Sequence, residues 1–150
     1  MNDVYEKTYQ HYLSRFDSLD LTSLETKLGV HLENNDIIVP LFKKPYTVSA
    51  GGVFGPSGNR PALYVSIILF KYLYMCPDVR PNQRQWASFR DLKDTGPLTT
   101  YFVNDIERPI AENFSGKPED LGNAAKQLGG YPADLEGAYD LAIQFDALPR

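Results

Sequence analysis

The sequence predicts an α+β fold, a single domain in which a small antiparallel sheet packs against about four to five helices. Three observations support it: apolar stripes of helical period in both halves of the chain, short β-rich pieces from Ile37 to Phe54, and proline or glycine at the element boundaries. A length of 150 residues with 43% hydrophobic side chains suits one packed core. We therefore expect residues 1–150 to form one domain.

An N-terminal helix pair is expected over about residues 4–28. The first helix, Val4 to Phe16, carries an apolar stripe at three- and four-residue spacing, formed by Tyr5, Tyr9, Tyr12, Leu13 and Phe16. The second, Thr22 to Leu28, repeats this spacing and meets Gly29, which supplies a left-handed stop. This pair is expected to cover one side of the core.

Short β-rich pieces at 37–42, 46–48 and 53–54 predict a small antiparallel meander. Pro40 cannot donate a backbone hydrogen bond, so its strand is expected at an edge of the sheet or bulged there. Residues 55–59, rich in glycine and proline, should then close the meander as a turn.

A buried apolar helix is expected next, beginning at Pro61 and ending before Pro77. Its residues from Leu63 to Met75 are apolar nearly all the way round, which is typical of a helix buried on most sides. A buried strand is the alternative, but a run of about fourteen residues favours a helix. The run is too short to span a membrane, which needs about 20 apolar residues.

Two further helices and a strand are expected in the second half. The first helix opens at Pro97 and should kink or split at Pro109. Its apolar stripe, of period near four, consists of Leu98, Tyr101, Phe102, Ile106, Ile110 and Phe114. The second helix starts at Pro118 and stops at Gly129. It is expected to turn four side chains inward, Leu121, Ala124, Ala125 and Leu128. Alternating apolar and polar residues from Tyr139 to Phe145 predict a final strand.

The charge balance disfavours several classes of partner. The 19 acidic residues outnumber the 15 basic ones, which gives a formal net charge of −4 and a pI near 5.1. Because there is no basic arm or run of lysines, binding to nucleic acid or to an anionic membrane is disfavoured. The first residues lack the basic and apolar segments of a signal peptide, so we expect a cytoplasmic location.

Metal and cofactor sites are not predicted from this chain. Cys76 is the single cysteine, whereas an iron–sulfur cluster usually takes four thiolates. The two histidines, His11 and His31, form no recognised ligand spacing with it. Solvated carboxylates are the simpler explanation of the acidic C-terminal region. An all-oxygen magnesium or calcium site stays open, because four carboxylates lie close in sequence, at Asp134, Glu136, Asp140 and Asp146.

The best candidate for a binding site lies between residues 86 and 108. The residues proposed for ligand binding are Trp86, Phe89, Arg90, Asn104 and Arg108. Such a set suits a small anionic or planar ligand, because arginine offers paired donors and aromatic rings offer stacking surface. In the structural alternative, the two rings are core anchors and the two arginines pair with nearby acids, Asp91, Asp105 or Glu107.

Three functional hypotheses follow from these residues. The first is a non-catalytic binding or accessory domain that uses the five residues above. The second is an enzyme, which would need buried carboxylates and a tyrosine in one pocket, such as Asp91, Tyr101, Asp105 and Glu107. The third is a protein-interaction module acting through an exposed sheet edge. The lack of a serine-nucleophile or metal-ligand motif favours a protein that is not an enzyme.

Two blocks of the sequence resemble a known family. Trp-Ala-Ser-Phe-Arg-Asp-Leu-Lys-Asp at 86–94 and the segment from Tyr139 to Arg150 are similar to landmarks of the domain-of-unknown-function family numbered thirty-seven eighty-six. The likeness runs from about Tyr46 to Arg150. This family occurs mainly in anaerobic bacteria and archaea, and some members are described as iron–sulfur proteins. The resemblance therefore implies a role in anaerobic metabolism, and it assigns no catalytic residue.

The resemblance also has two consequences at the ends of the chain. Some relatives carry an additional N-terminal domain with four cysteines, whereas this chain has the helix pair instead. Relatives usually continue past the final Leu-Pro-Arg with another apolar strand, so the chain is either truncated at Arg150 or a short member. In both cases the strand from Tyr139 to Phe145 has an exposed edge, and we expect a homodimer or a protein partner to pair with it.

Overall fold

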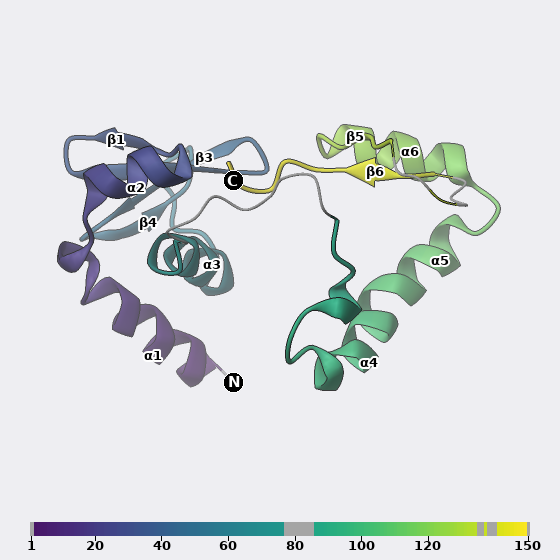
Figure 1. Cartoon of the computed structure of the whole chain (residues 1–150), viewed down its shortest axis with the longest axis horizontal. Helices are drawn as coiled ribbons and strands as arrows, with labels where there is room; N and C mark the ends of the chain where they lie inside the picture. Colours follow the sequence, from purple (N-terminus) through teal and green to yellow (C-terminus); the bar gives the residue numbers. More distant parts are fainter. Residues whose placement is uncertain (1, 77–85, 135–136, 138–140, 150) are drawn as a thin grey trace. The chain divides into compact units, whose positions relative to one another are not determined.

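The chain divides into two compact units. The computed structural model describes residues 2–76, 86–134, 137 and 141–149. The first unit comprises Met1–Pro81 with Asp146–Arg150, and the second comprises Asn82–Phe145. Helices and antiparallel strands occur in both units, which confirms the α+β class (Figure 1). That residues 1–150 fold as one domain stays a prediction, because it concerns whether the two units unfold together.

The predicted N-terminal helix pair is confirmed in the first unit. It consists of α1 (Asn2–Leu13) and α2 (Leu21–Leu28), joined through a 3₁₀ turn at Phe16–Ser18. The side chain of Asp20 caps α2 by accepting a hydrogen bond from a first-turn N–H. Gly29 ends α2 with a left-handed φ of 68°, as its position in the sequence predicts.

A four-stranded antiparallel sheet follows in the first unit. Its strands lie in chain order, β1 (His31–Glu33), β2 (Asp36–Leu41), β3 (Lys44–Ser49) and β4 (Gly52–Phe54). The predicted meander corresponds to the last three strands, and β1 was missed. The signal for β1 is the pair Asn34 and Asn35, whose φ angles of 50° and 69° suit a two-residue hairpin turn.

Pro40 does not lie on an edge strand, because β2 pairs with both β1 and β3. However, β1 reaches along β2 only as far as Ile38, so Pro40 lies beyond the end of β1. On the other side Pro40 faces Pro45 of β3, one pair away from the turn at 42–43. In an antiparallel hairpin closed by two residues, that second pair is the one without backbone hydrogen bonds. Neither proline therefore interrupts the bonds between β2 and β3.

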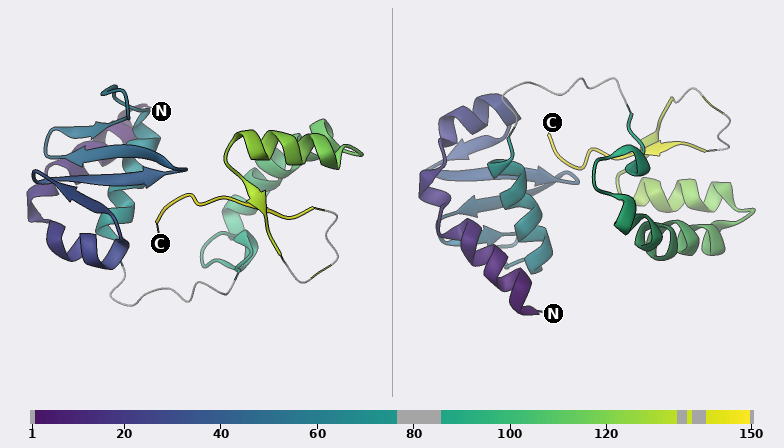
Figure 2. Two further views of the ribbon diagram at one scale, coloured as in Figure 1. Left: turned by 90° about the horizontal axis from the view of Figure 1, so that it is seen from above. Right: turned by 60° about the horizontal axis from the view of Figure 1, so that its bottom comes forward.

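The core of the first unit lies between the sheet and its helices. Figure 2 shows α1 and α3 (Leu63–Tyr74) side by side on one face of the sheet. The most deeply buried side chains come from the strands and from α3, namely Ile37, Val39, Val48, Val53, Leu69, Phe70 and Leu73. Alternation along β2 places Ile37 and Val39 inward, which is the pattern of a sheet with one covered face. Leu148 also packs against this core.

The predicted apolar helix is α3, and it is buried on most sides, as expected. Phe70 has no exposed surface, and the exposed residues Tyr64, Ile68 and Lys71 share one narrow stripe. Among the described residues, no helix combines the length and the apolar character needed to cross a membrane.

The described part of the second unit contains three α-helical segments with a π turn between the first two. After a 3₁₀ turn at Gly96–Leu98, the chain forms α4 (Thr99–Phe102), the π turn Val103–Glu107 and α5 (Arg108–Phe114). The expected interruption near Pro109 takes the form of this π turn. Proline at 109 cannot donate to the carbonyl four residues earlier, so regular α-helical bonding is already broken there.

The last helix and strands of the second unit agree only in part with the prediction from the sequence. Helix α6 (Pro118–Gln127) is confirmed, and Ala125 is buried, but Leu128 is 72% exposed rather than turned inward. Of the strand predicted from Tyr139 to Phe145, the described residues form only β6 (Ile143–Gln144). Leu141 and Ala142 are not in a strand, and residues 139–140 lie outside the described part of the chain. It pairs with β5 (Tyr131–Pro132), which was not predicted.

Candidate functional site

All five residues predicted to bind a ligand lie in the second unit, and two of them belong to a 3₁₀ turn at Phe89–Asp91. The hydroxyl oxygen of Ser88 accepts a hydrogen bond from the Arg90 N–H at 3.2 Å. In return, the Ser88 N–H donates to Oδ2 of Asp91 at 3.2 Å. This capping box fixes the turn and occupies the Asp91 carboxylate, one of the groups that the enzyme hypothesis requires.

Two contacts join this turn to the helix that follows. The rings of Phe89 and Phe102 are stacked, with centroids 4.3 Å apart and planes 12° from parallel. Nη2 of Arg90 donates to both carboxylate oxygens of Glu107, at 3.0 and 2.8 Å. The side chains of this ion pair are 52% and 40% exposed, so the pair contributes about 0–1 kcal/mol.

The π turn explains why both contacts fall on one side of the helix. Phe102 and Glu107 are five residues apart, and a regular α-helix would rotate them about 140° from each other. A π turn is closed by hydrogen bonds between residues five apart, so it brings positions five apart back onto one side.

The five predicted residues therefore differ in their surroundings. Arg90 is paired with Glu107, which confirms the structural alternative for this residue. The role of core anchor is wrong for Trp86, which is 69% exposed, while Phe89 is half-buried against Phe102. Asn104 and Arg108 are exposed, and their side chains form no hydrogen bond or ion pair with the residues that the structure describes. The ligand site stays a prediction.

An exposed apolar stripe runs along this same helix. Four large side chains make it up, Leu98 (53% exposed), Tyr101 (67%), Ile106 (47%) and Ile110 (45%). They are spaced by three, five and four residues, and the π turn accommodates the step of five between Tyr101 and Ile106. All four belong to the apolar stripe that the sequence predicts between residues 98 and 114. We call these four residues the helix stripe.

The second unit buries few apolar side chains. Among its described residues, Ala125 is the one apolar side chain classed as buried, and Thr95 is the one polar side chain. Trp86, Leu92 and Leu128 are at least half exposed, as are two of the four residues of the helix stripe. The helix stripe is therefore one part of an unusually exposed apolar surface.

The three carboxylates named in the enzyme hypothesis, those of Asp91, Asp105 and Glu107, are not buried. Glu107 pairs with Arg90, and Asp91 accepts a hydrogen bond in the capping box. Asp105 is exposed, and Tyr101 is 67% exposed. Groups arranged in this way do not converge on a site that excludes water, which acid–base catalysis by shifted carboxylates requires.

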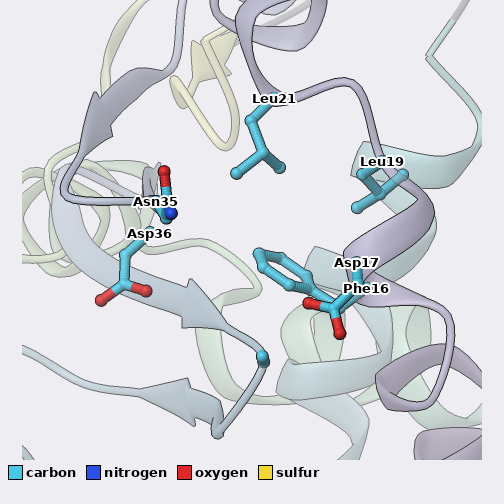
Figure 3. A pocket seen from close by; sticks show the side chains of 7 residues that line it. Phe16, Asp17, Leu19, Leu21, Asn35 and Asp36 are labelled. Carbon is cyan, nitrogen blue, oxygen red and sulfur yellow. The ribbon is translucent and has the colours of Figure 1, made fainter.

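The described residues of the first unit line two pockets that are relevant to a binding site. One has a volume of about 330 Å³ and is lined mainly by residues around Phe16 and Asp36 (Figure 3). The other, of about 500 Å³, is lined by Tyr5, Ala62, Leu63 and Tyr64. Neither is lined by a residue of the predicted binding segment 86–108.

Candidate metal-ligating side chains are spread over the described residues. No group of three or more histidine, cysteine, aspartate or glutamate side chains lies close enough within them to hold a metal ion. Cys76 is the single thiol, and His31 lies 3.5 Å from the Glu25 carboxylate. Of the four carboxylates considered for magnesium or calcium, Glu136 and Asp140 lie outside the described residues.

One tyrosine of the first unit has a shifted acidity. Partial burial raises the pKa of Tyr74 above its ordinary value of 10.0, and the nearby Arg15 guanidinium partly offsets this effect. The Tyr74 hydroxyl donates a hydrogen bond to the carbonyl of Tyr12 at 2.8 Å. Its ring also stacks on that of Tyr12, with centroids 5.2 Å apart. These contacts place Tyr74 in the packing between α1 and α3.

The comparison with protein families gives one match. The family described as Domain of unknown function (DUF3786) matches residues 20–150. The matched region thus begins at the start of α2, earlier than the expected start near Tyr46, and includes the four-stranded sheet. No curated protein and no solved structure matches the chain.

Proposed function

Since this chain belongs to the DUF3786 family, whose description leaves its activity open, we propose from the geometry that it is a non-catalytic accessory domain that binds another protein through the helix stripe. The observation that carries the proposal is the exposure of four large apolar side chains on one helix face. The cytoplasmic location, expected from the N-terminal residues, and the role in anaerobic metabolism, implied by the family resemblance, belong to this proposal.

The energetics of the second unit support a partner. Ordering a residue costs about 1–2 kcal/mol of backbone entropy, which burial of apolar surface has to offset. The first unit has a continuous core for this purpose, whereas Ala125 is the one buried apolar side chain among the described residues of the second unit. An isolated helix of this length is marginal in water. A partner that covers the helix stripe would supply burial that the unit itself lacks.

The geometry of the stripe supports a partner with an apolar groove. Helices bound in grooves present anchor residues that repeat once per turn on one face. In a regular α-helix, Ile106 and Ile110 would lie on a different face from Leu98 and Tyr101. The π turn adds one residue between 101 and 106 and so brings all four side chains onto one face. π turns are rare in proteins, and those that occur are often found at functional sites. A tyrosine among the anchors also suits an interface, where a large ring contacts the partner.

Site-specific photo-crosslinking in the producing cell tests this proposal. A photoreactive residue at Tyr101 should join the chain to one partner protein of defined mass. The matched control position is Leu128, which is 72% exposed in the same unit but lies after α6. Adducts of equal pattern from both positions, or cross-links that stay within one chain, would argue against partner binding through the stripe.

Purified components then measure the contribution of the stripe. Ile106→Asp should weaken the complex by at least about tenfold, because a buried unpaired carboxylate is strongly unfavourable. Leu128→Asp should leave the affinity unchanged. If the cross-linked partner is a second copy of this chain, sedimentation should show a dimer that Ile106→Asp dissociates.

A small anionic ligand is the second candidate, and the open donors of Asn104 and Arg108 favour it. Native mass spectrometry and an absorption spectrum of protein purified without oxygen would reveal a bound molecule at fixed stoichiometry. Arg108→Ala should then remove the molecule and leave the fold intact. Retention of the molecule by this variant would exclude Arg108 from the site.

A further inference from the structure

A pocket in the first unit combines an apolar floor with two carboxylates. It lies where the 3₁₀ turn after α1, the start of α2 and the β1–β2 turn meet, and its volume is about 330 Å³. Figure 3 shows the ring of Phe16 in the middle of the pocket, with Asp36 on one side and Asp17 on the other. The remaining lining residues are Leu19, Leu21, Asn35 and Ala50.

The floor of the pocket is fixed by the core. Phe16 is 3% exposed and belongs to the hydrophobic core, and Leu19 and Leu21 pack against the same core. A side chain held in this way does not have to be ordered when a ligand arrives, which lowers the cost of binding. The pocket therefore provides a preformed apolar surface.

The two carboxylates have no side-chain partner within the described part of the chain. Neither Asp17 nor Asp36 accepts a side-chain hydrogen bond or forms an ion pair among the residues that the structure describes. Other acids of the first unit are used locally, since Asp20 caps α2 and Asp3 pairs with Lys7. No lysine or arginine is among the residues that line the pocket.

We propose that this pocket binds a primary alkylammonium group, with the ammonium between the carboxylates of Asp17 and Asp36 and its alkyl chain against Leu19 and Leu21, which pack beside the buried Phe16 ring. An ammonium offers three donors to carboxylate oxygens and to the amide oxygen of Asn35. A volume of about 330 Å³ is at the lower end for ligand sites, which suits a short amine and excludes a large planar cofactor. The group comes either from a free aliphatic amine or from a lysine side chain of another protein.

A divalent cation fits the pocket less well. Calcium takes about 6–8 oxygen ligands, and magnesium demands a nearly octahedral set. The pocket offers the side-chain oxygens of Asp17, Asp36 and Asn35, and four of its seven lining residues are apolar. Hydrocarbon next to a bare metal ion contributes nothing to its binding, whereas it stabilises an alkyl chain through burial.

Amide NMR titrations of the full chain test the site. Pentylamine, pentane-1,5-diamine and blocked lysine (Nα-acetyl-lysine methylamide) serve as cationic probes, and pentanol is the neutral probe of similar shape. At least one cationic probe should cause saturable shifts confined to residues 16–21, 35–36 and 50. Pentanol should cause none of comparable size. Tighter binding of the free amines would indicate a metabolite, and tighter binding of blocked lysine would indicate a protein side chain.

Charge-removing variants provide the decisive comparison. Asp36→Asn and Asp17→Asn keep the shape of the side chain, and each should weaken binding of the best probe by about tenfold. Asp3→Asn, which removes an exposed acid that pairs with Lys7 on α1, is the matched control and should not change the affinity. Equal affinities in all three variants, shifts spread over every acidic residue, or no saturable shift with any cationic probe would overturn the proposal. The amide spectra themselves verify that each variant is folded. This site is independent of the helix stripe, so failure of either proposal leaves the other intact.

Discussion

The two units of this chain use similar helices and strands but bury them to very different extents. In α3 of the first unit, Leu69, Phe70 and Leu73 are at most 1% exposed. In the helix of the second unit, Tyr101 is 67% and Ile110 is 45% exposed. Both helices follow regular apolar patterns in the sequence. Periodicity thus indicates which side chains share a face, and it does not indicate whether the chain itself covers that face.

The largest expected effect concerns the core of the first unit. Phe70 is fully buried and its ring lies 5.7 Å from that of Tyr9 and 6.1 Å from that of Tyr12. Phe70→Ala should lower the free energy of unfolding by about 3–5 kcal/mol, because it removes apolar contacts and leaves a cavity. Tyr64→Ala, at a position of the same helix that is 62% exposed, should change it by about 0.5 kcal/mol or less. Urea unfolding measures both.

The same variant tests whether the two units form one domain. If they unfold as one cooperative domain, amide NMR signals of both units should disappear at the same, lowered urea concentration in Phe70→Ala. If the second unit folds separately, its signals should keep the midpoint of the unsubstituted protein. This outcome would show the prediction of a single domain to be wrong.

The next prediction concerns two glycines of the second unit. It tests whether this unit has specific packing although many of its apolar side chains are exposed. At Gly130, an added Cβ would lie 2.8 Å from the Phe145 ring and 2.9 Å from the backbone oxygen of Ala125. Gly130→Ala should therefore destabilise this unit by about 1–3 kcal/mol. Gly122→Ala is the control in α6, where nothing lies within 4 Å of the added Cβ, and it should stabilise the helix by up to about 1 kcal/mol.

Hydrogen exchange of the amides in α6 measures both glycine variants. Opposite changes in protection would mean that the packing of Gly130 against Phe145 is specific. If both variants changed protection in the same direction, helix propensity alone would determine the stability of α6. The two units would then differ in specific packing even more than we infer.

The contrast in burial also decides what could be predicted from the sequence. The stripes of α1 and α2 and the stop at Gly29 were predicted because each pattern reflects a core that is present. In the second unit, Leu128 was assigned inward and the strand after Tyr139 was drawn too long, since the unit has little core to bury them. Patterns alone could not reveal this difference.

The candidate site was predictable to a smaller extent. The pairing of Arg90 with an acid was foreseen as an alternative, because several acids lie nearby in sequence. The stack of Phe89 on Phe102 joins residues far apart in sequence, so no local pattern predicts it. The π turn had a visible signal, the step of five between Tyr101 and Ile106, but a single irregular step also fits a stripe that simply drifts around the helix.

A smaller effect, dependent on pH, is expected in the first unit. Burial raises the pKa of Tyr74, so above pH 10 the unfolded chain releases this proton before the folded chain does. The folded state therefore loses stability as the pH rises from 10 towards the raised pKa. Tyr74→Phe removes this loss, and at neutral pH it should cost about 0.5–1.5 kcal/mol through the missing hydrogen bond to Tyr12. The difference in the free energy of unfolding between the unsubstituted protein and Tyr74→Phe, measured with urea, should become smaller above pH 10. A difference that stays constant with pH would contradict this assignment.

The smallest effect concerns the ion pair that joins the turn at 89–91 to the helix of the second unit. Because the side chains of Arg90 and Glu107 are about half exposed, a double-mutant cycle with Arg90→Ala and Glu107→Ala should give a coupling free energy of about 0–1 kcal/mol. The coupling should fall as salt is added, since exposed charges are screened. Coupling well above this range would mean that the pair is covered in solution by something that keeps water away. Such a result would itself support a bound partner over the helix of the second unit, and the same cycle repeated with the purified partner would measure how far binding strengthens the pair.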